Sequence, residues 1–199
     1  MTLALALLPF LALLTAFSGP AVLPALGLLT AISVVTLHHL NPALDTGRIL
    51  FVAFVALVIS IVPVWRLGAY AEQSEPARIP AALSLSLTLS VGVCMNLSAG
   101  EIFPFLSGVP VNPSAITTAL MIVFAGLATL AVRPGIKFQL AGLLSACDGI
   151  LLAAADTAQT HVVWLLGIGI LFLAGAGSWL AQRLSLLSIT SNRYEHDNP

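Results

Sequence analysis

The chain has 199 residues, of which 59% are hydrophobic and only 8% are charged (7 Lys and Arg, 8 Asp and Glu). Soluble domains carry about 25% charged residues, and so few charges cannot cover the surface of a soluble enzyme without large apolar patches. The net charge of −1, with no basic stripe, excludes a protein that binds nucleic acid. The composition therefore predicts an integral membrane protein.

Apolar stretches long enough to cross a bilayer recur along the whole chain. A transmembrane helix needs about 20 mainly apolar residues, and Pro, Gly and charged residues divide the sequence into seven such stretches. We therefore predict an all-α, polytopic membrane protein with about seven transmembrane helices. The predicted spans are 2–18, 21–40, 48–68, 81–99, 113–133, 138–156 and 161–183.

The first apolar stretch differs from a secretory signal peptide, because no Lys or Arg precedes it and the first basic residue is Arg48. We expect it to be a retained helix. Whether residues 1–40 form two full spans stays open. The chain divides into four N-terminal helices within 1–112, a three-helix unit at 113–183, and a polar tail at 184–199 with partial order at most.

The basic residues predict how the helices are oriented. Cytoplasmic loops of membrane proteins are enriched in Lys and Arg, and with seven crossings only Arg48 falls on the side opposite to the rest. We expect the N-terminus outside, the C-terminus in the cytoplasm, and the chain as a multi-pass protein of the cell (inner) membrane. The six residues on the predicted cytoplasmic side are Arg66, Arg78, Arg133, Lys137, Arg183 and Arg193.

Asp148, near the middle of the sixth span, is the strongest candidate for a functional group. Ionisable residues inside a span are costly and mark proton or ion routes more often than other positions do. A carboxyl group at that depth suits reversible proton binding, and Ser145, three residues earlier, is its expected hydrogen-bond partner. An equally good interpretation is a neutral Asp148 that joins helices by hydrogen bonds. Cys147 is the neighbouring candidate on a proton pathway.

Asp156 and His161 lie near the predicted outer end of the sixth span. Together with Thr157, Gln159 and Thr160 they form a polar cluster. A solvated helix end is the favoured interpretation, and a mouth for protons in which His161 pairs with Asp156 is the alternative.

The seventh span contains no acidic residue and many small ones. We expect its small residues to let another helix approach closely, either within the chain or in a partner. These residues are Gly167, Gly169, Gly175, Gly177 and Ser178.

Motifs for catalysis and cofactor binding are missing from the sequence. It contains no Walker loop, no dinucleotide glycine fingerprint, and no CxxC, CxxCH or HExxH pattern. We therefore expect no catalytic residues, no metal and no cofactor. The chain would be at most a non-catalytic subunit of a larger assembly.

The last three spans have a layout that resembles a known group of small membrane proteins. A helix ends at the turn Arg133-Pro-Gly-Ile-Lys137, and the next carries Gln139, Gly142 and Cys147-Asp148-Gly149-Ile150. This unit resembles the K subunit of complex I and the C component of Mrp-type antiporters, and with four preceding helices the chain is similar to the hydrogenase-4 component E family. In that family the middle helix carries an acid–Asn–Gly motif on a proton route. Aligned on the Gln and Gly residues, Cys147 occupies the acid position and Asp148 the Asn position, about 100° away around the helix.

The resemblance implies a small subunit of a complex-I-related or antiporter-related complex that translocates ions. Its partners would be larger integral-membrane subunits and the lipid bilayer, and its role would be scaffolding, with a proton pathway past Asp148. The alternative is a stand-alone transporter, or a substrate-binding membrane component, for a small solute.

Overall fold

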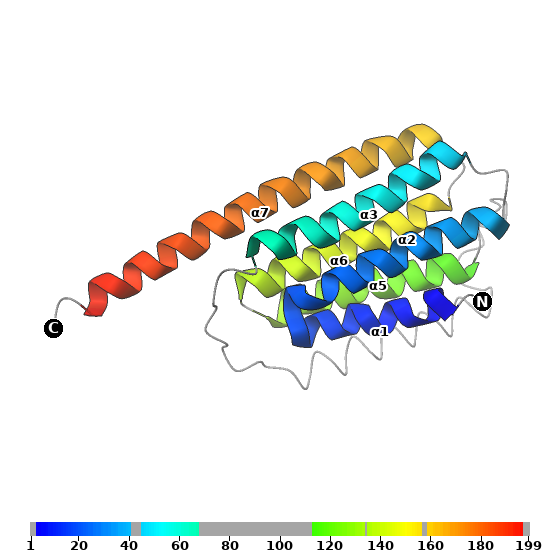
Figure 1. The fold of residues 1–199 in the computed structure, drawn as a ribbon. Helices are drawn as coiled ribbons and strands as arrows, with labels where there is room; N and C mark the ends of the chain where they lie inside the picture. Colours follow the sequence, from blue (N-terminus) through cyan, green and yellow to red (C-terminus); the bar gives the residue numbers. More distant parts are fainter. Residues whose placement is uncertain (1–2, 41–44, 68–112, 134, 157–158, 197–199) are drawn as a thin grey trace.

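The computed structural model describes residues 3–40, 45–67, 113–133, 135–156 and 159–196. Every regular element in these ranges is a helix, which confirms the predicted all-α class (Figure 1). The predicted span 81–99 lies outside the described residues. The elements are α1 (Leu3–Ser18), the short 3₁₀ helix η1 (Gly19–Val22), α2 (Leu23–Leu40), α3 (Thr46–Leu67), α5 (Pro113–Val132), α6 (Ile136–Ala155) and α7 (Thr160–His196).

Four helical stretches of the described chain are long and apolar enough to cross a membrane. A shorter apolar helix, Ala115–Ala131, lies within α5. These helices are compatible with a membrane protein, whereas a total of seven spans and the direction of insertion stay predictions. The four stretches are Ala4–His39, Thr46–Arg66, Ile136–Ala155 and Thr160–Arg183.

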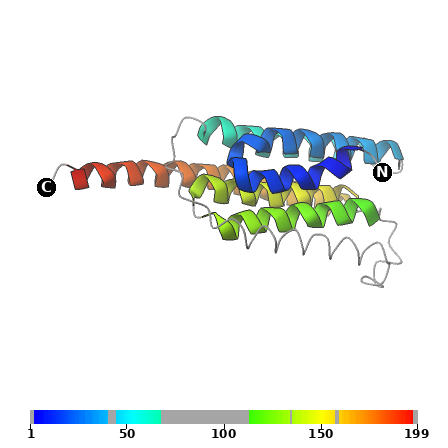
Figure 2. The same cartoon turned by 90° about the horizontal axis from the view of Figure 1, so that it is seen from below.

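The first of these stretches is folded back on itself at Gly19. This glycine has φ of +59°, a left-handed conformation that other residues adopt only at a cost. A Cβ atom at this position would also lie 2.9 Å from Cε1 of Phe138 on α6. The chain reverses through η1, so that α1 and α2 run in opposite directions side by side (Figures 1 and 2).

Helix α6 occupies the centre of the bundle, where it contacts α1, α2, α3, α5 and α7. Thirteen of its 20 residues are buried. Two sets of small residues explain why it fits there. A Cβ atom on Gly142 would lie 2.6 Å from the carbonyl oxygen of Gly126 on α5, and a Cβ on Gly149 would lie 2.7 Å from that of Ala119. The α5 and α6 backbones therefore touch, as small residues allow in membrane helix pairs.

Helix α7 is longer than the sequence predicted. Its 37 residues extend the span beyond Arg183 to His196, past the end of the other helices (Figure 1). The expectation of a tail with partial order was wrong for 184–196, because that stretch contains no Pro or Gly that would end a helix. At about 1.5 Å per residue α7 measures roughly 55 Å, well above the 30 Å hydrocarbon core of a bilayer.

The glycines of α7 divide into two groups. Gly167 packs against the ring of Phe51 on α3, and Gly177 lies against Leu140 of α6. A Cβ atom on Gly169 or Gly175 would meet no atom of the described structure within 4 Å. The prediction of close packing therefore holds for the first pair within this chain, whereas the second pair is exposed.

The described basic residues lie at the two ends of the bundle. Arg66, Arg133 and Lys137 lie at the end where α3 and α5 finish and α6 begins, and α7 runs toward this end to Arg183 (Figure 1). Arg48 lies at the opposite end, in the first turn of α3. The described basic residues thus lie mostly at one end of the bundle, and which end faces the cytoplasm stays a prediction. We call these the Arg133 end and the Arg48 end.

Candidate functional site: a buried carboxyl group on the central helix

Asp148 lies in the middle of α6 and is completely buried, with 0% of its surface exposed. Its Oδ2 accepts a hydrogen bond of 3.1 Å from Oγ of Ser60, which lies on α3. Within the described ranges, Oδ1 has no hydrogen-bond partner. The carboxyl group therefore has one oxygen that is fixed by a neighbouring helix and one that no described residue satisfies.

Ser60 reaches Asp148 because α2 makes room for it. A Cβ atom on Gly27 would overlap the Cβ and Oγ of Ser60 and would lie 2.8 Å from the carbonyl oxygen of Ala56. Only a glycine at this position of α2 lets the Ser60 side chain stay between the two helices. The site is therefore built from three helices: Gly27 on α2, Ser60 on α3 and Asp148 on α6.

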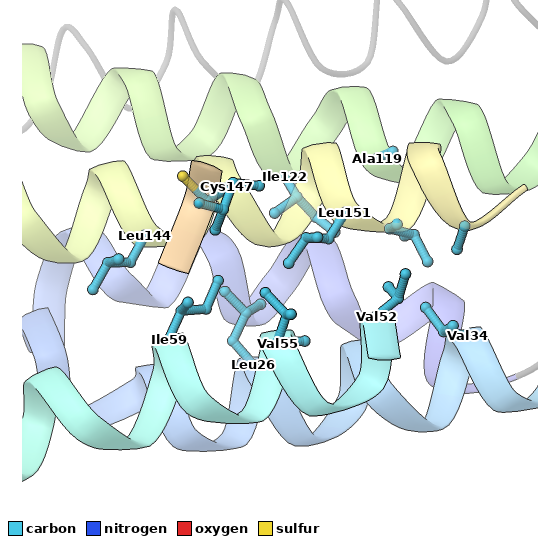
Figure 3. Close-up of a cluster of buried hydrophobic side chains, with 14 of the residues drawn as sticks. Leu26, Val34, Val52, Val55, Ile59, Ala119, Ile122, Leu144, Cys147 and Leu151 are labelled. Carbon is cyan, nitrogen blue, oxygen red and sulfur yellow. The ribbon is translucent and has the colours of Figure 1, made fainter. Parts of the chain in front are cut away.

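Apolar side chains surround this site on the described helices. Leu144 and Leu151 lie one turn before and after the carboxyl group on α6, and Ile59 and Val55 face them from α3 (Figure 3). An ionised carboxylate without a counter-charge in such surroundings costs several kcal/mol. Among the described residues, the Ser60 hydroxyl is the hydrogen-bond partner that the carboxyl group has in these surroundings.

The two predicted neighbours of Asp148 are also buried. Cys147 is a free thiol and belongs to the apolar cluster on α6. Ser145 is fully buried, yet its Oγ makes no hydrogen bond with any described residue. The expected bond between Ser145 and Asp148 was therefore wrong, and Ser60 supplies the hydroxyl group instead. A prediction from the sequence could only reach partners on the same helix, whereas Ser60 is 88 residues away in the chain.

The second polar group lies at the Arg48 end. Arg48 is only 2% exposed, and its Nη2 donates a hydrogen bond of 3.2 Å to the carbonyl oxygen of Ala155, the last residue of α6. Asp156, which follows directly, is 7% exposed. A cation at a helix C-terminus is favourable because it faces the unpaired carbonyl groups. Asp156 is therefore buried, whereas Gln159 and His161 of the same predicted cluster are exposed, as a solvated helix end would be.

His161 differs from Asp156 in its surroundings, since it is exposed in the first turn of α7. Its expected pairing with Asp156 stays a prediction. Asp156 is eight residues from Asp148, about 12 Å along α6, and the fully buried Leu151 and Leu152 lie between them. The structure therefore holds the candidate proton-pathway residues in two separate groups, one at the centre and one at the end of the bundle.

In the described ranges, no three His, Cys, Asp or Glu residues gather as the ligands of a metal ion would. The central site offers a carboxyl group, a hydroxyl group and apolar walls. Such a set can bind and release a proton, and it can join helices by a hydrogen bond.

No family model, no curated protein and no solved structure matches the chain.

Proposed function

We propose that this protein is a small integral-membrane subunit of a complex-I-related or antiporter-related complex in the cell membrane, and that Asp148 carries protons within it. The observation that supports this most is the position of Asp148. It is a fully buried acid of the central helix α6, and within the described ranges it is held through Oδ2, by Ser60.

The hydrogen bond from Ser60 supports a group that exchanges a proton. A hydroxyl donor can stabilise the carboxylate when the proton leaves and can remain bonded to the carbonyl oxygen when the proton returns. A purely structural carboxyl group would be expected to have both oxygens satisfied, because each buried polar atom without a partner costs about 1–3 kcal/mol. Oδ1 of Asp148 has no such partner among the described residues.

The exposed side of α7 supports the role of a subunit. Leu165 and Phe172 are 78% and 79% exposed, and the unpacked Gly169 lies between them in the sequence. Large apolar side chains beside a small residue form a surface that another membrane helix can contact closely. α7 also extends beyond the bundle, where it can reach a larger neighbour.

Purification in mild detergent from the native membrane tests the assembly. We expect larger membrane subunits to co-purify with the chain. A stable monomer that alone transports a small solute, and whose thermal stability rises with that solute, would overturn the proposal in favour of a stand-alone transporter.

The variant Asp148→Asn tests the proton role in the assembled complex. The amide keeps an oxygen that can accept the bond from Ser60 but cannot exchange a proton. Since a positioned acid or base contributes about 100-fold or more to a proton-transfer rate, we expect a loss of that order in proton translocation with assembly intact. Asp45→Asn, at an exposed acid, is the matched control. Unchanged translocation in Asp148→Asn would refute the relay.

A further inference from the structure

We infer that Ser60 is a positioning residue for Asp148: it holds the carboxyl group at Oδ2 and leaves Oδ1 without a partner among the described residues. The inference rests on the proposed function and deepens it. Its starting point is the hydrogen bond of 3.1 Å that joins Ser60 Oγ on α3 to Asp148 Oδ2 on α6.

This bond can persist in both protonation states of the carboxyl group. A hydroxyl group can donate to a carboxylate or carbonyl oxygen, and it can also accept from a protonated carboxyl group. When a proton arrives, an O–H bond forms on the carboxyl group. The same bond breaks when the proton leaves to water or to the next group, and the Ser60 hydroxyl keeps its own proton throughout.

The other carboxyl oxygen takes no part in this bond. Oδ1 is buried and, on the described helices, has no hydrogen-bond partner. A second buried oxygen without a described partner, Oγ of Ser145, lies three residues earlier on α6. Proton exchange at Oδ1 would therefore not require the bond to Ser60 to break.

Gly27 is the third residue of this arrangement, because its missing side chain leaves the space between α2 and α3 that Ser60 occupies. A side chain at Gly27 would overlap both the Cβ and the Oγ of Ser60. The substitution Gly27→Ala is therefore expected to push the hydroxyl group away from Asp148. Gly27 thus affects the hydrogen bond of Asp148 indirectly, through the position of Ser60.

Infrared spectroscopy of the full chain in its native complex tests the inference directly. The carboxylic C=O band of Asp148 is identified as the band that Asp148→Asn removes. Ser60→Ala deletes the donor with little change in volume, so we expect the band to move to higher frequency. The control is Ser33→Ala, at a fully buried serine of α2 whose Oγ has no hydrogen-bond partner within the described structure. This control should leave the band in place.

Two compensating substitutions, a larger residue at Gly27 and a smaller one at Ser60, separate the effect of the lost hydrogen bond from the effect of the changed packing. Gly27→Ala should shift the band and lower the melting temperature. The double variant Gly27→Ala/Ser60→Gly should recover part of the melting temperature and keep the shifted band. The inference would be overturned if Ser60→Ala left the band at its wild-type frequency. It would also be overturned if the band of the double variant lay at the wild-type frequency.

The readouts also distinguish the two proposals. If Asp148→Asn leaves proton translocation unchanged while Ser60→Ala still shifts the band, the proposed function fails and the geometry of Ser60 stands. If Asp148→Asn abolishes translocation and Ser60→Ala changes neither the band nor the rate, the positioning role of Ser60 fails alone. We expect Ser60→Ala to shift the band and to lower the rate by about tenfold, less than the loss in Asp148→Asn.

Discussion

Replacement of Gly142 by Ala tests the contact that holds the central helix in place. A Cβ atom there would lie 2.6 Å from the carbonyl oxygen of Gly126 and 3.1 Å from the backbone nitrogen of Leu130. Ordinary carbon–oxygen contacts begin at about 3.3 Å, so α5 and α6 would have to separate by roughly 0.7 Å. Because both atoms belong to the backbone, no side-chain rotation can relieve the overlap.

The expected cost follows from two opposing effects. Overpacking of a tight interface costs about 1–3 kcal/mol, whereas Ala is better than Gly inside a helix by about 1 kcal/mol. We therefore expect Gly142→Ala to lower the free energy of unfolding by up to about 2 kcal/mol, whereas an alanine at an unpacked helix position would raise it by about 1 kcal/mol. Denaturant titration of the purified protein in mixed micelles, followed by circular dichroism, measures this quantity.

Three further variants sharpen the test. Gly126→Ala meets the same interface from α5, since its Cβ would lie 2.7 Å from the nitrogen of Ala146. Once one alanine has separated the helices the second should cost less, so the double variant should be less destabilised than the sum of the two. Gly169→Ala is the matched control, because nothing described lies within 4 Å. If Gly142→Ala proves as harmless as Gly169→Ala, the close contact between α5 and α6 is refuted.

Three other substitutions probe the remaining contacts by the same unfolding assay. Arg48→Met removes the buried cation that α3 places against the end of α6, and it should lower the free energy of unfolding by about 1.5–3 kcal/mol. Arg66→Met, at an exposed position, should change this free energy little. Equal effects of the two substitutions would argue against the buried contact. Gly19→Ala places a side chain at φ of +59° and should cost about 1–2 kcal/mol, and a negligible loss would show that the turn is built differently. Gly167→Ala should destabilise the wild-type protein but not a Phe51→Ala background, where the overlapping ring is absent; a similar cost in both backgrounds would contradict the packing of α7 on α3.

The positions of the helices could be predicted from the sequence because hydropathy and turn residues act locally. Every predicted span outside 81–99 overlaps a helix of the described structure, and Gly19 lies where the chain reverses between α1 and α2. The length of α7 was underestimated because the polar residues after Arg183 were taken to end the helix. Polarity ends a membrane span, but it does not end a helix.

The central site could be predicted only in part. Asp148 stands out as an acid within an apolar run, so its burial in a helix followed from the sequence. Ser60 gave no signal, because a single serine inside an apolar helix is common and nothing in the pattern relates it to a residue on α6. Gly27 gave none either, since its importance depends on how α2 and α3 cross. Arg48 was assigned to the opposite end correctly, but its contact with α6 is a product of packing.

The rate of proton translocation by the assembled complex is the measurement that tests the role of Asp148 most directly. With Asp148→Asn we predict a rate lower by about 100-fold or more, with the subunits still assembled and the Asp45→Asn control at the wild-type rate. A complex that contains Asp148→Asn and translocates protons at the wild-type rate would contradict the account, because it would leave the buried carboxyl group with a structural role only.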